Sequence, residues 1–120
     1  MKKLIEVPTV SGFSSWGPTV NLELKPEIVA PGEDVYATLN DNRYGSMSGT
    51  SMASPIVAGA SALLLPRIRQ MTPPEGMTRM DLLRIILMNT ATPLVDVLDS
   101  SGHALENSPR QQGAGLLQID

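Results

Sequence analysis

The stretch Ser48-Gly49-Thr50-Ser51-Met52-Ala53-Ser54-Pro55 decides the fold of this 120-residue chain. It is a Gly- and Ser-rich turn, and an apolar run from Ile56 to Leu65 follows it directly. Thr50 is a residue type that caps helix N-termini well, so the sequence predicts a helix from about Ser51 to Leu65. Pro66 is expected to kink or end that helix, because its ring removes a backbone hydrogen bond.

The predicted helix has small or apolar side chains on every side, among them Ala58, Gly59 and Leu63. A helix without a polar face belongs in the interior of a protein. The apolar run from Ile56 to Leu65 is shorter than the roughly 20 residues that a bilayer-spanning helix needs. We therefore expect a buried core helix and no transmembrane segment.

Short strands are expected before this helix. Phe13–Trp16 and Glu27–Ala30 are short runs that end at Gly-Pro or Pro-Gly turn pairs. Asp34–Leu39 places apolar side chains at every second position, as a strand does, and Asn40–Asn42 has the composition of a turn. Strands followed by helices indicate an α/β layer arrangement.

A second helix is expected to open at Thr78, where Asp81 stands three residues on in the manner of a capping box. It should stop before Thr92, which precedes a proline. A turn at Asp99–Gly102 and a short closing element after Gly113 are expected to complete the chain.

Composition and charge restrict the functions open to the chain. We expect one domain over residues 1–120, because 42% hydrophobic and 18% charged residues are typical of a globular protein. A net charge of −3 with scattered basic residues argues against nucleic-acid binding. The lack of cysteine excludes disulfides and thiolate metal sites. Residues 1–7 lack the apolar run of a signal peptide, so any export signal is expected upstream.

The chemistry that the sequence offers centres on Ser51. A serine at the start of a helix places its hydroxyl beside a backbone N–H and the positive end of the helix dipole. Those groups can hold the oxyanion of an acyl-transfer intermediate. Plain capping of the helix by a Gly-Thr-Ser sequence is the alternative, and the residues taken alone leave it open.

Three stretches together resemble one family. Gly49–Pro55, followed by Val57-Ala58-Gly59, resembles the nucleophile motif of the subtilisin-like serine proteases, or subtilases. Phe13–Pro18 and Lys25–Gly32 are similar to two further segments of that family and occur in the expected order. The tail Ser108–Gly115 is similar to the end of the catalytic domain in cell-envelope proteinases of the lactocepin and streptococcal C5a-peptidase type. The resemblance covers nearly all of residues 11–118.

This resemblance implies a partial subtilisin-like α/β fold, in which parallel strands, a buried nucleophile helix and covering helices form the C-terminal part of a peptidase catalytic domain. It implies a serine endopeptidase in which Ser51 is the nucleophile, its backbone N–H is one oxyanion donor, and Met52 stands near the leaving-group side. The substrates would be peptides or proteins, and the parent would be extracellular or bound to the cell wall. No cofactor is expected in this chain, although the resemblance allows calcium in a full-length parent.

The catalytic partners of Ser51 are expected elsewhere. In the family the aspartate, the histidine and an oxyanion-hole asparagine all precede the serine, so they should lie before residue 11. His103 is the single histidine, and it is expected to be an exposed loop residue. Surface or capping roles are expected for the aspartates Asp34, Asp41, Asp81, Asp96 and Asp99. We therefore expect the chain alone to be inactive.

Two other interpretations were weighed. The chain could be a non-catalytic structural piece that docks on the missing half-domain or self-associates, because a sheet that is cut partway leaves an unpaired edge. A lipase-like hydrolase is disfavoured, because Ala53 occupies a position where the Gly-x-Ser-x-Gly elbow requires glycine. One departure from the subtilase pattern concerns Glu27, which stands where aspartate is usual.

Overall fold

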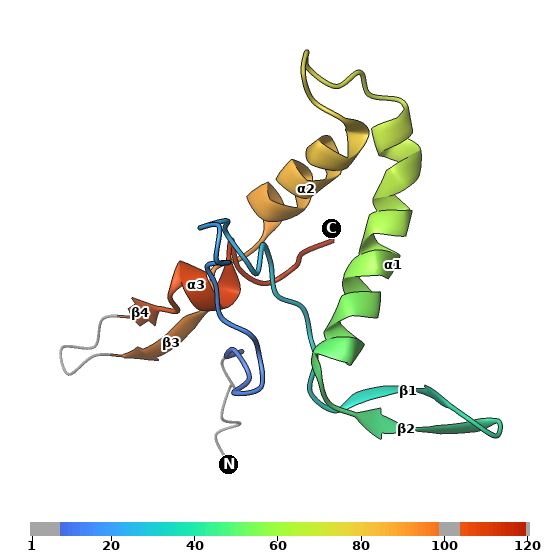
Figure 1. The fold of residues 1–120 in the computed structure, drawn as a ribbon. Coiled ribbons are helices and arrows are strands. Elements are labelled where there is room, and N and C mark those ends of the chain that lie inside the picture. Colours follow the sequence, from blue (N-terminus) through green and yellow to red (C-terminus); the bar gives the residue numbers. More distant parts are fainter. Residues whose placement is uncertain (1–7, 99–103, 120) are drawn as a thin grey trace.

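The computed structural model describes residues 8–98 and 104–119. In chain order the elements are β1 (Val35–Leu39), β2 (Arg43–Met47), α1 (Thr50–Arg69), α2 (Arg79–Thr90), β3 (Val95–Leu98), β4 (Ala104–Glu106) and α3 (Pro109–Gln112). In Figure 1, α2 lies beside α1, and the hairpins β1–β2 and β3–β4 project on opposite sides. The β1–β2 hairpin starts at the foot of α1 and therefore belongs to the region of Ser51.

The chain is a mixed α/β structure, as expected, but its sheets differ from the prediction. Within the described ranges both sheets are two-stranded and antiparallel, and the β3–β4 pair carries an irregularity in register. Parallel pairing is limited to an isolated bridge between Val29 and Leu116, and Leu116 also bridges Thr92 in antiparallel fashion. Parallel strands need neighbours that cover both faces of the sheet, and this chain supplies few of them.

The strands predicted before α1 are confirmed only in part. Asp34–Leu39 forms β1 with a start at Val35, and the turn after it has positive φ angles at Asp41 and Asn42, which these residue types tolerate. Phe13–Trp16 is a turn followed by irregular chain, so the predicted strand there is wrong. In Glu27–Ala30 only Val29 pairs. Turn-forming Gly-Pro pairs mark where a strand could end, but they do not provide the neighbour that a strand needs.

Helix α1 is longer at both ends than predicted. Its N-cap is Gly49, with a φ of 152°, and Thr50 is already the first helical residue. It continues through Pro66 to Arg69 instead of ending at Leu65. Pro66 removes one hydrogen bond, but the next turn carries Ile68, which is 1% exposed. Burial of that side chain outweighs the lost hydrogen bond, because a fully buried aliphatic side chain stabilises by roughly 1.5–3 kcal/mol.

The core sits between the C-terminal half of α1 and α2. Ile68 packs with Leu83 and Leu87 of α2, and partly buried apolar residues surround them: Ile28, Leu64, Leu82, Ile86 and Leu117. The rest of α1 has little cover, since Ala60 and Ile68 are its only buried residues and Leu63 is 72% exposed. The expectation of a buried helix is therefore wrong for this chain by itself, because the described residues cover mainly the C-terminal half of α1.

By length and composition alone, α1 could also cross a bilayer, since it has 20 residues and an apolar composition. A core helix of a globular domain passes the same test. We favour a core helix because prolines occur at positions 55 and 66 and because Ile68 packs against α2. The apolar run from Ile56 to Leu65 gave too short an estimate of the length of this helix, which has 20 residues.

Helix α2 forms as the sequence predicts. Thr78 is its N-cap, and the capping box with Asp81 is complete in both directions. The helix ends at Thr90, ahead of Thr92 and its proline. The predicted turn at Asp99–Gly102 lies outside the described residues.

The C-terminal segment ties distant parts of the chain together. The buried side chain of Gln112 accepts a hydrogen bond from the Leu94 N–H at 2.7 Å and donates to the carbonyl oxygens of Leu94 and Asn107 at 3.2 and 2.6 Å. Arg110 Nε donates to the Gly17 carbonyl at 2.8 Å, and the Gly17 N–H donates back to the Arg110 carbonyl. We call this set of contacts the C-terminal clasp.

Candidate acyl-transfer site at the start of helix α1

Ser51 is the second residue of α1, and it is exposed to solvent. The first hydrogen bonds of the helix come from Met52 and Ala53, whose N–H groups donate to the Gly49 carbonyl at 3.0 and 3.4 Å. The N–H groups of Thr50 and Ser51 come before Met52 in the first turn, and the N–H groups at the start of a helix have no acceptor within the helix. The Ser51 N–H therefore lies beside its own hydroxyl, available to an external acceptor.

The electrostatic character of this helix start favours an anion. Gly49 has no side chain with which to cap the helix, and no acidic residue lies in the first turn. The positive end of the helix dipole is therefore not compensated locally. Arg67 and Arg69 lie in the last turn, where they suit the negative end. A negative charge that develops at Ser51 would be stabilised.

Two hydrogen bonds fix the turn that precedes Ser51. The Gly49 N–H donates to the Gly32 carbonyl at 2.8 Å, and the Ser48 hydroxyl accepts from the Asp34 N–H at 2.9 Å. At Gly32 an added Cβ would lie 3.0 Å from the Gly49 carbonyl oxygen, so glycine allows this close approach. Pro31-Gly32 and the turn before Ser51, which are well separated in sequence, thus form one rigid unit.

A cavity of about 690 Å³ lies beside this unit. The three stretches that the sequence singled out all contribute to its wall, including Phe13, Ser14, Ser15, Ile28, Val29, Ala30, Pro31, Gly32, Thr50, Ala53, Ser54 and Val57. The last four share one face of α1, as the helical period requires. Ser51 is not among the lining residues. Ser51 therefore lies in the same turn of α1 as cavity-lining residues but does not itself line the cavity.

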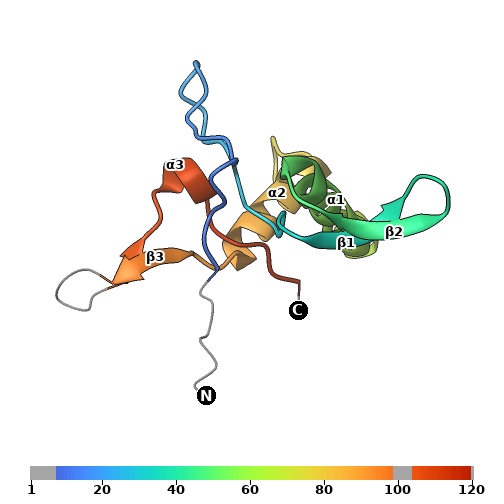
Figure 2. The ribbon, with the colours of Figure 1, turned by 90° about the horizontal axis from the view of Figure 1, so that it is seen from below.

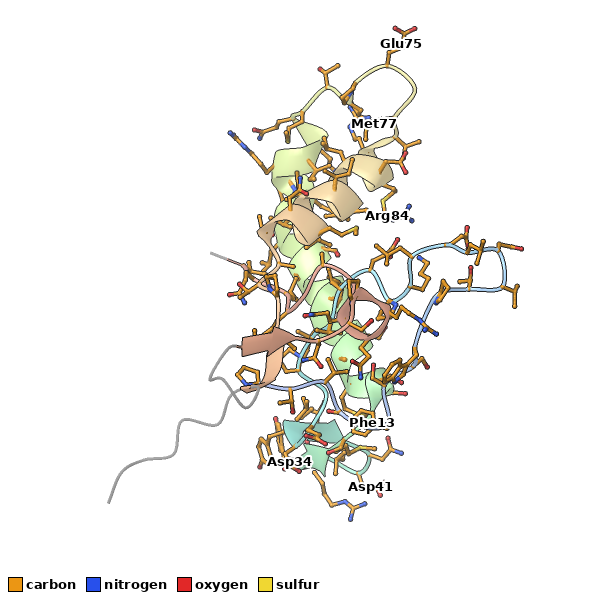
Figure 3. The ribbon with its side chains drawn as sticks, turned by 90° about the vertical axis from the view of Figure 1, so that its left-hand side faces the viewer. Phe13, Asp34, Asp41, Glu75, Met77 and Arg84 are labelled. Atoms are coloured by element: carbon orange, nitrogen blue, oxygen red, sulfur yellow. The ribbon has the colours of Figure 1, made fainter. Side chains whose placement is uncertain are left out.

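Among the described residues, the other candidates from the sequence lie on elements other than the start of α1. Asp34 and Asp41 are exposed on the β1–β2 hairpin, where Figure 3 labels them, and Asp81 caps α2. Asp96 lies in β3. Asp99 and His103 lie outside the described residues. In the part of the chain that the structure describes, no group of three or more His, Asp or Glu residues could hold a metal ion.

The carboxyl of Asp81, in the first turn of α2, has a clearly altered acidity. Hydrogen bonds from the Thr78 side chain and backbone hold the pKa of this carboxyl below its usual value. The Thr78 hydroxyl and N–H lie 2.6 and 2.8 Å from Asp81 Oδ2. The shift therefore belongs to helix capping, and it carries no sign of catalysis.

Sequence reasoning missed two features near the site. Glu27 is not a free surface carboxylate, because its Oε1 pairs with Lys25 Nζ at 3.0 Å and with Arg84 Nε at 2.8 Å. It thereby links the cavity wall to α2. Tyr36 and Tyr44 stack on the β1–β2 hairpin. The alternation in β1 and β2 could have placed both tyrosines on one face, had the register of the hairpin been known.

Taken together, the start of α1 combines an exposed hydroxyl, a backbone N–H without an intrahelical acceptor and a helix dipole without a nearby acidic residue. The chain belongs to the subtilase family, whose sequence profile matches residues 6–115. The resemblance of three short motifs thus extends over nearly the whole chain.

Similar sequences agree with this family assignment. The chain is 42% identical over 118 residues to the PII-type proteinase of Lactococcus lactis subsp. cremoris, covering 92% of this chain and 6% of that protein. It is 44% identical over 120 residues to the C5a peptidase of Streptococcus pyogenes, covering 92% of this chain and 10% of that protein. The chain therefore spans a small part of the length of these relatives.

Solved structures agree with the sequence comparison. The chain aligns with the Clostridium perfringens CspB protease with a TM-score of 0.58 and 29% identity, over 84% of this chain and 20% of that one. It aligns with the prenylagaramide maturation protease PagA with a TM-score of 0.57 and 28% identity, over 87% of this chain and 33% of that one. The fold is thus that of part of a subtilase.

Proposed function

We propose that Ser51 is the nucleophile of a serine endopeptidase and that it forms an acyl-enzyme with a peptide substrate. This proposal rests on the position of the subtilase motif at a helix start that has no side-chain cap, where Ser51 is exposed. Attack of the Oγ on a peptide carbonyl would place negative charge on the carbonyl oxygen. The Ser51 N–H and the helix dipole would stabilise that charge.

The proton of Ser51 needs an acceptor that this sequence does not place near it. We propose that the aspartate, the histidine and the second oxyanion donor come from outside residues 1–120 and assemble around Ser51 in the complete catalytic domain. An unassisted serine hydroxyl is a weak nucleophile. In subtilisin itself, loss of the histidine lowers kcat by on the order of a millionfold. The 120-residue chain alone should therefore be inactive.

The relatives named above are proteinases and a peptidase, which supports peptides or proteins as the substrate class. We place the parent protein outside the cell or at the cell wall, on its resemblance to cell-envelope proteinases. Labelling of the serine does not depend on that location and tests the chemistry directly.

A fluorophosphonate probe tests the role of Ser51. The 120-residue chain should label slowly or not at all, whereas the full-length parent should label rapidly at Ser51. Ser51→Ala in the parent should abolish labelling and peptide cleavage. Ser61→Ala is the matched control, because Ser61 lies on α1 away from the helix start and outside the cavity wall, so labelling should stay intact. Cleavage that survives Ser51→Ala would refute the nucleophile, and rapid labelling of the isolated chain would refute its inactivity.

A second candidate function is docking through the uncovered part of α1. Leu63 is 72% exposed on a helix with little cover, and an open cavity lies at the helix start. A partner could cover both, either as the rest of the catalytic domain or as a second copy of this chain. Light scattering tests self-association, and a strictly monomeric, cooperatively folded chain would exclude it. Leu63→Lys should shift any dimer toward monomer, because it places a charge on the exposed face.

A further inference from the structure

Both tyrosines of the chain lie on one face of the β1–β2 hairpin. Tyr36 pairs with Ser46 and Tyr44 pairs with Thr38, so the two rings are diagonal neighbours across the strands. Their centroids are 6.1 Å apart with an interplanar angle of 19°. A stacked pair at this distance is an attractive arrangement and holds both rings in place.

This aromatic face is open to solvent. Tyr36 is 71% exposed and Tyr44 is 63% exposed. In Figures 1 and 2 the turn end of the hairpin extends away from α1 and α2. The opposite face is different, because the Leu39 side chain lies over Gly45 and covers part of the strands. Two large rings that are held together and left uncovered form a platform for a ligand.

The charges around the platform favour a cation. Glu33 and Asp34 lie at the base of the hairpin and Asp41 at its turn, against a single basic residue, Arg43. Arg43 pairs with Asp41 at 3.4 Å. Among the described residues, neither Glu33 nor Asp34 forms an ion pair, so their charge is not compensated. A cation over a tyrosine ring is attracted by the π electrons, and nearby carboxylates add to that attraction.

The platform is tied rigidly to the turn before Ser51. Strand β2 ends at Met47 and leads straight into that turn. The hydrogen bond from Asp34 N–H to the Ser48 hydroxyl, 2.9 Å long, closes the base of the hairpin. Tyr44 and Met47 are three positions apart along β2, which is about 10 Å at roughly 3.3 Å per residue. An extended peptide at Ser51 would therefore reach the rings several residues away from the bond that Ser51 attacks.

We propose that the Tyr36–Tyr44 platform binds an arginine or lysine side chain of a polypeptide substrate, several residues from the bond that Ser51 attacks. This inference rests on the proposed function, because the platform serves a substrate of the same site. It adds a preference for basic residues at a distance from the scissile bond. The chemistry is a cation over π faces, with carboxylates at the base of the same hairpin.

The test is a titration of the 120-residue chain with two blocked peptides, one with a central arginine among alanines and one with neutral citrulline in its place. Binding is followed by the ring resonances of the two tyrosines in carbon-edited NMR spectra. The arginine peptide should bind about two- to fivefold more tightly, the range expected of an exposed cation–π contact. This comparison needs no variant, so it stays valid if a substituted hairpin fails to fold.

Variants then test which side chains hold the cation. Tyr36→Leu and Tyr44→Leu should each remove most of the preference for arginine, whereas Tyr36→Phe and Tyr44→Phe keep the ring and should retain it. Equal binding of the two peptides overturns the proposal. So does a preference for arginine that survives both leucine substitutions, because the carboxylates alone would then explain it. None of these measurements uses the Ser51 hydroxyl, so a failure of the proposed nucleophile is detected separately by the fluorophosphonate probe.

Discussion

Replacement of Gln112 by methionine should remove the centre of the C-terminal clasp. Gln112 is 3% exposed, and methionine has a similar length but no polar amide. The Leu94 N–H and the Asn107 carbonyl would both lose their hydrogen-bond partner. The Leu94 carbonyl would keep one, because it also accepts from the Asn107 N–H at 2.9 Å. Two orphaned groups at about 1–3 kcal/mol each give an expected loss of about 2–6 kcal/mol.

That loss is large beside the roughly 5–15 kcal/mol that stabilises an ordinary domain. Urea unfolding followed by circular dichroism measures it, and hydrogen exchange of the Leu94 amide locates it. Gln111→Met is the matched control on the same helix, because the Gln111 side chain makes no hydrogen bond among the described residues. If Gln112→Met and Gln111→Met unfold within about 0.5 kcal/mol of each other, the clasp does not stabilise the chain in the way we infer.

Three further outcomes are expected. Gly113→Ala should destabilise the chain strongly, because Gly113 has a φ of 61° and a Cβ there would meet the Pro26 and Glu27 carbonyls. Gly59→Ala should stabilise α1 by about 0.5–1 kcal/mol, since no atom lies within 4 Å of the added Cβ. The midpoints of urea unfolding compare the two variants. Thr78→Ala should cost about 1 kcal/mol through the lost cap. Because Thr78 lowers the pKa of the Asp81 carboxyl, this carboxylate stabilises the folded chain above about pH 4, and the stabilisation is lost as the pH falls through the pKa of the folded state. Thr78→Ala should therefore make helicity less dependent on pH in the acid range. Arg84→Met should lower the free energy of unfolding by less than about 1 kcal/mol, because the salt bridge between Arg84 and Glu27 is half-exposed. A larger decrease, measured by urea unfolding, would contradict this.

Local signals in the sequence were read correctly where local forces decide the structure. The capping box at Thr78 and Asp81 forms, because its two hydrogen bonds join residues three positions apart. The strand at Asp34–Leu39 forms within a hairpin, because its partner follows after a short turn. These elements need no information from distant parts of the chain.

Features that depend on distant contacts were not predictable. Gln112 reaches Leu94 across 18 positions, and Arg110 reaches Gly17 across 93. A glutamine and an arginine in a polar segment give no sign of such partners. The same limit explains the missing strand at Phe13–Trp16, since a strand forms only where another strand lies beside it. At the candidate site, the motif located Ser51 at the helix start, but it gave no indication that the serine lies outside the cavity wall.

The exposure of α1 and the missing base of Ser51 have one explanation under the proposed function. A partner that covers the apolar face around Leu63 gains roughly 1.5–3 kcal/mol for each large aliphatic side chain that becomes fully buried. If that partner is the rest of the catalytic domain, it also carries the histidine and aspartate, so burial of α1 and activation of Ser51 occur together. A second copy of this chain would bury α1 but would add only another His103. Self-association should therefore cover the helix without making Ser51 reactive, and a dimer that labels rapidly with fluorophosphonate would contradict this reasoning.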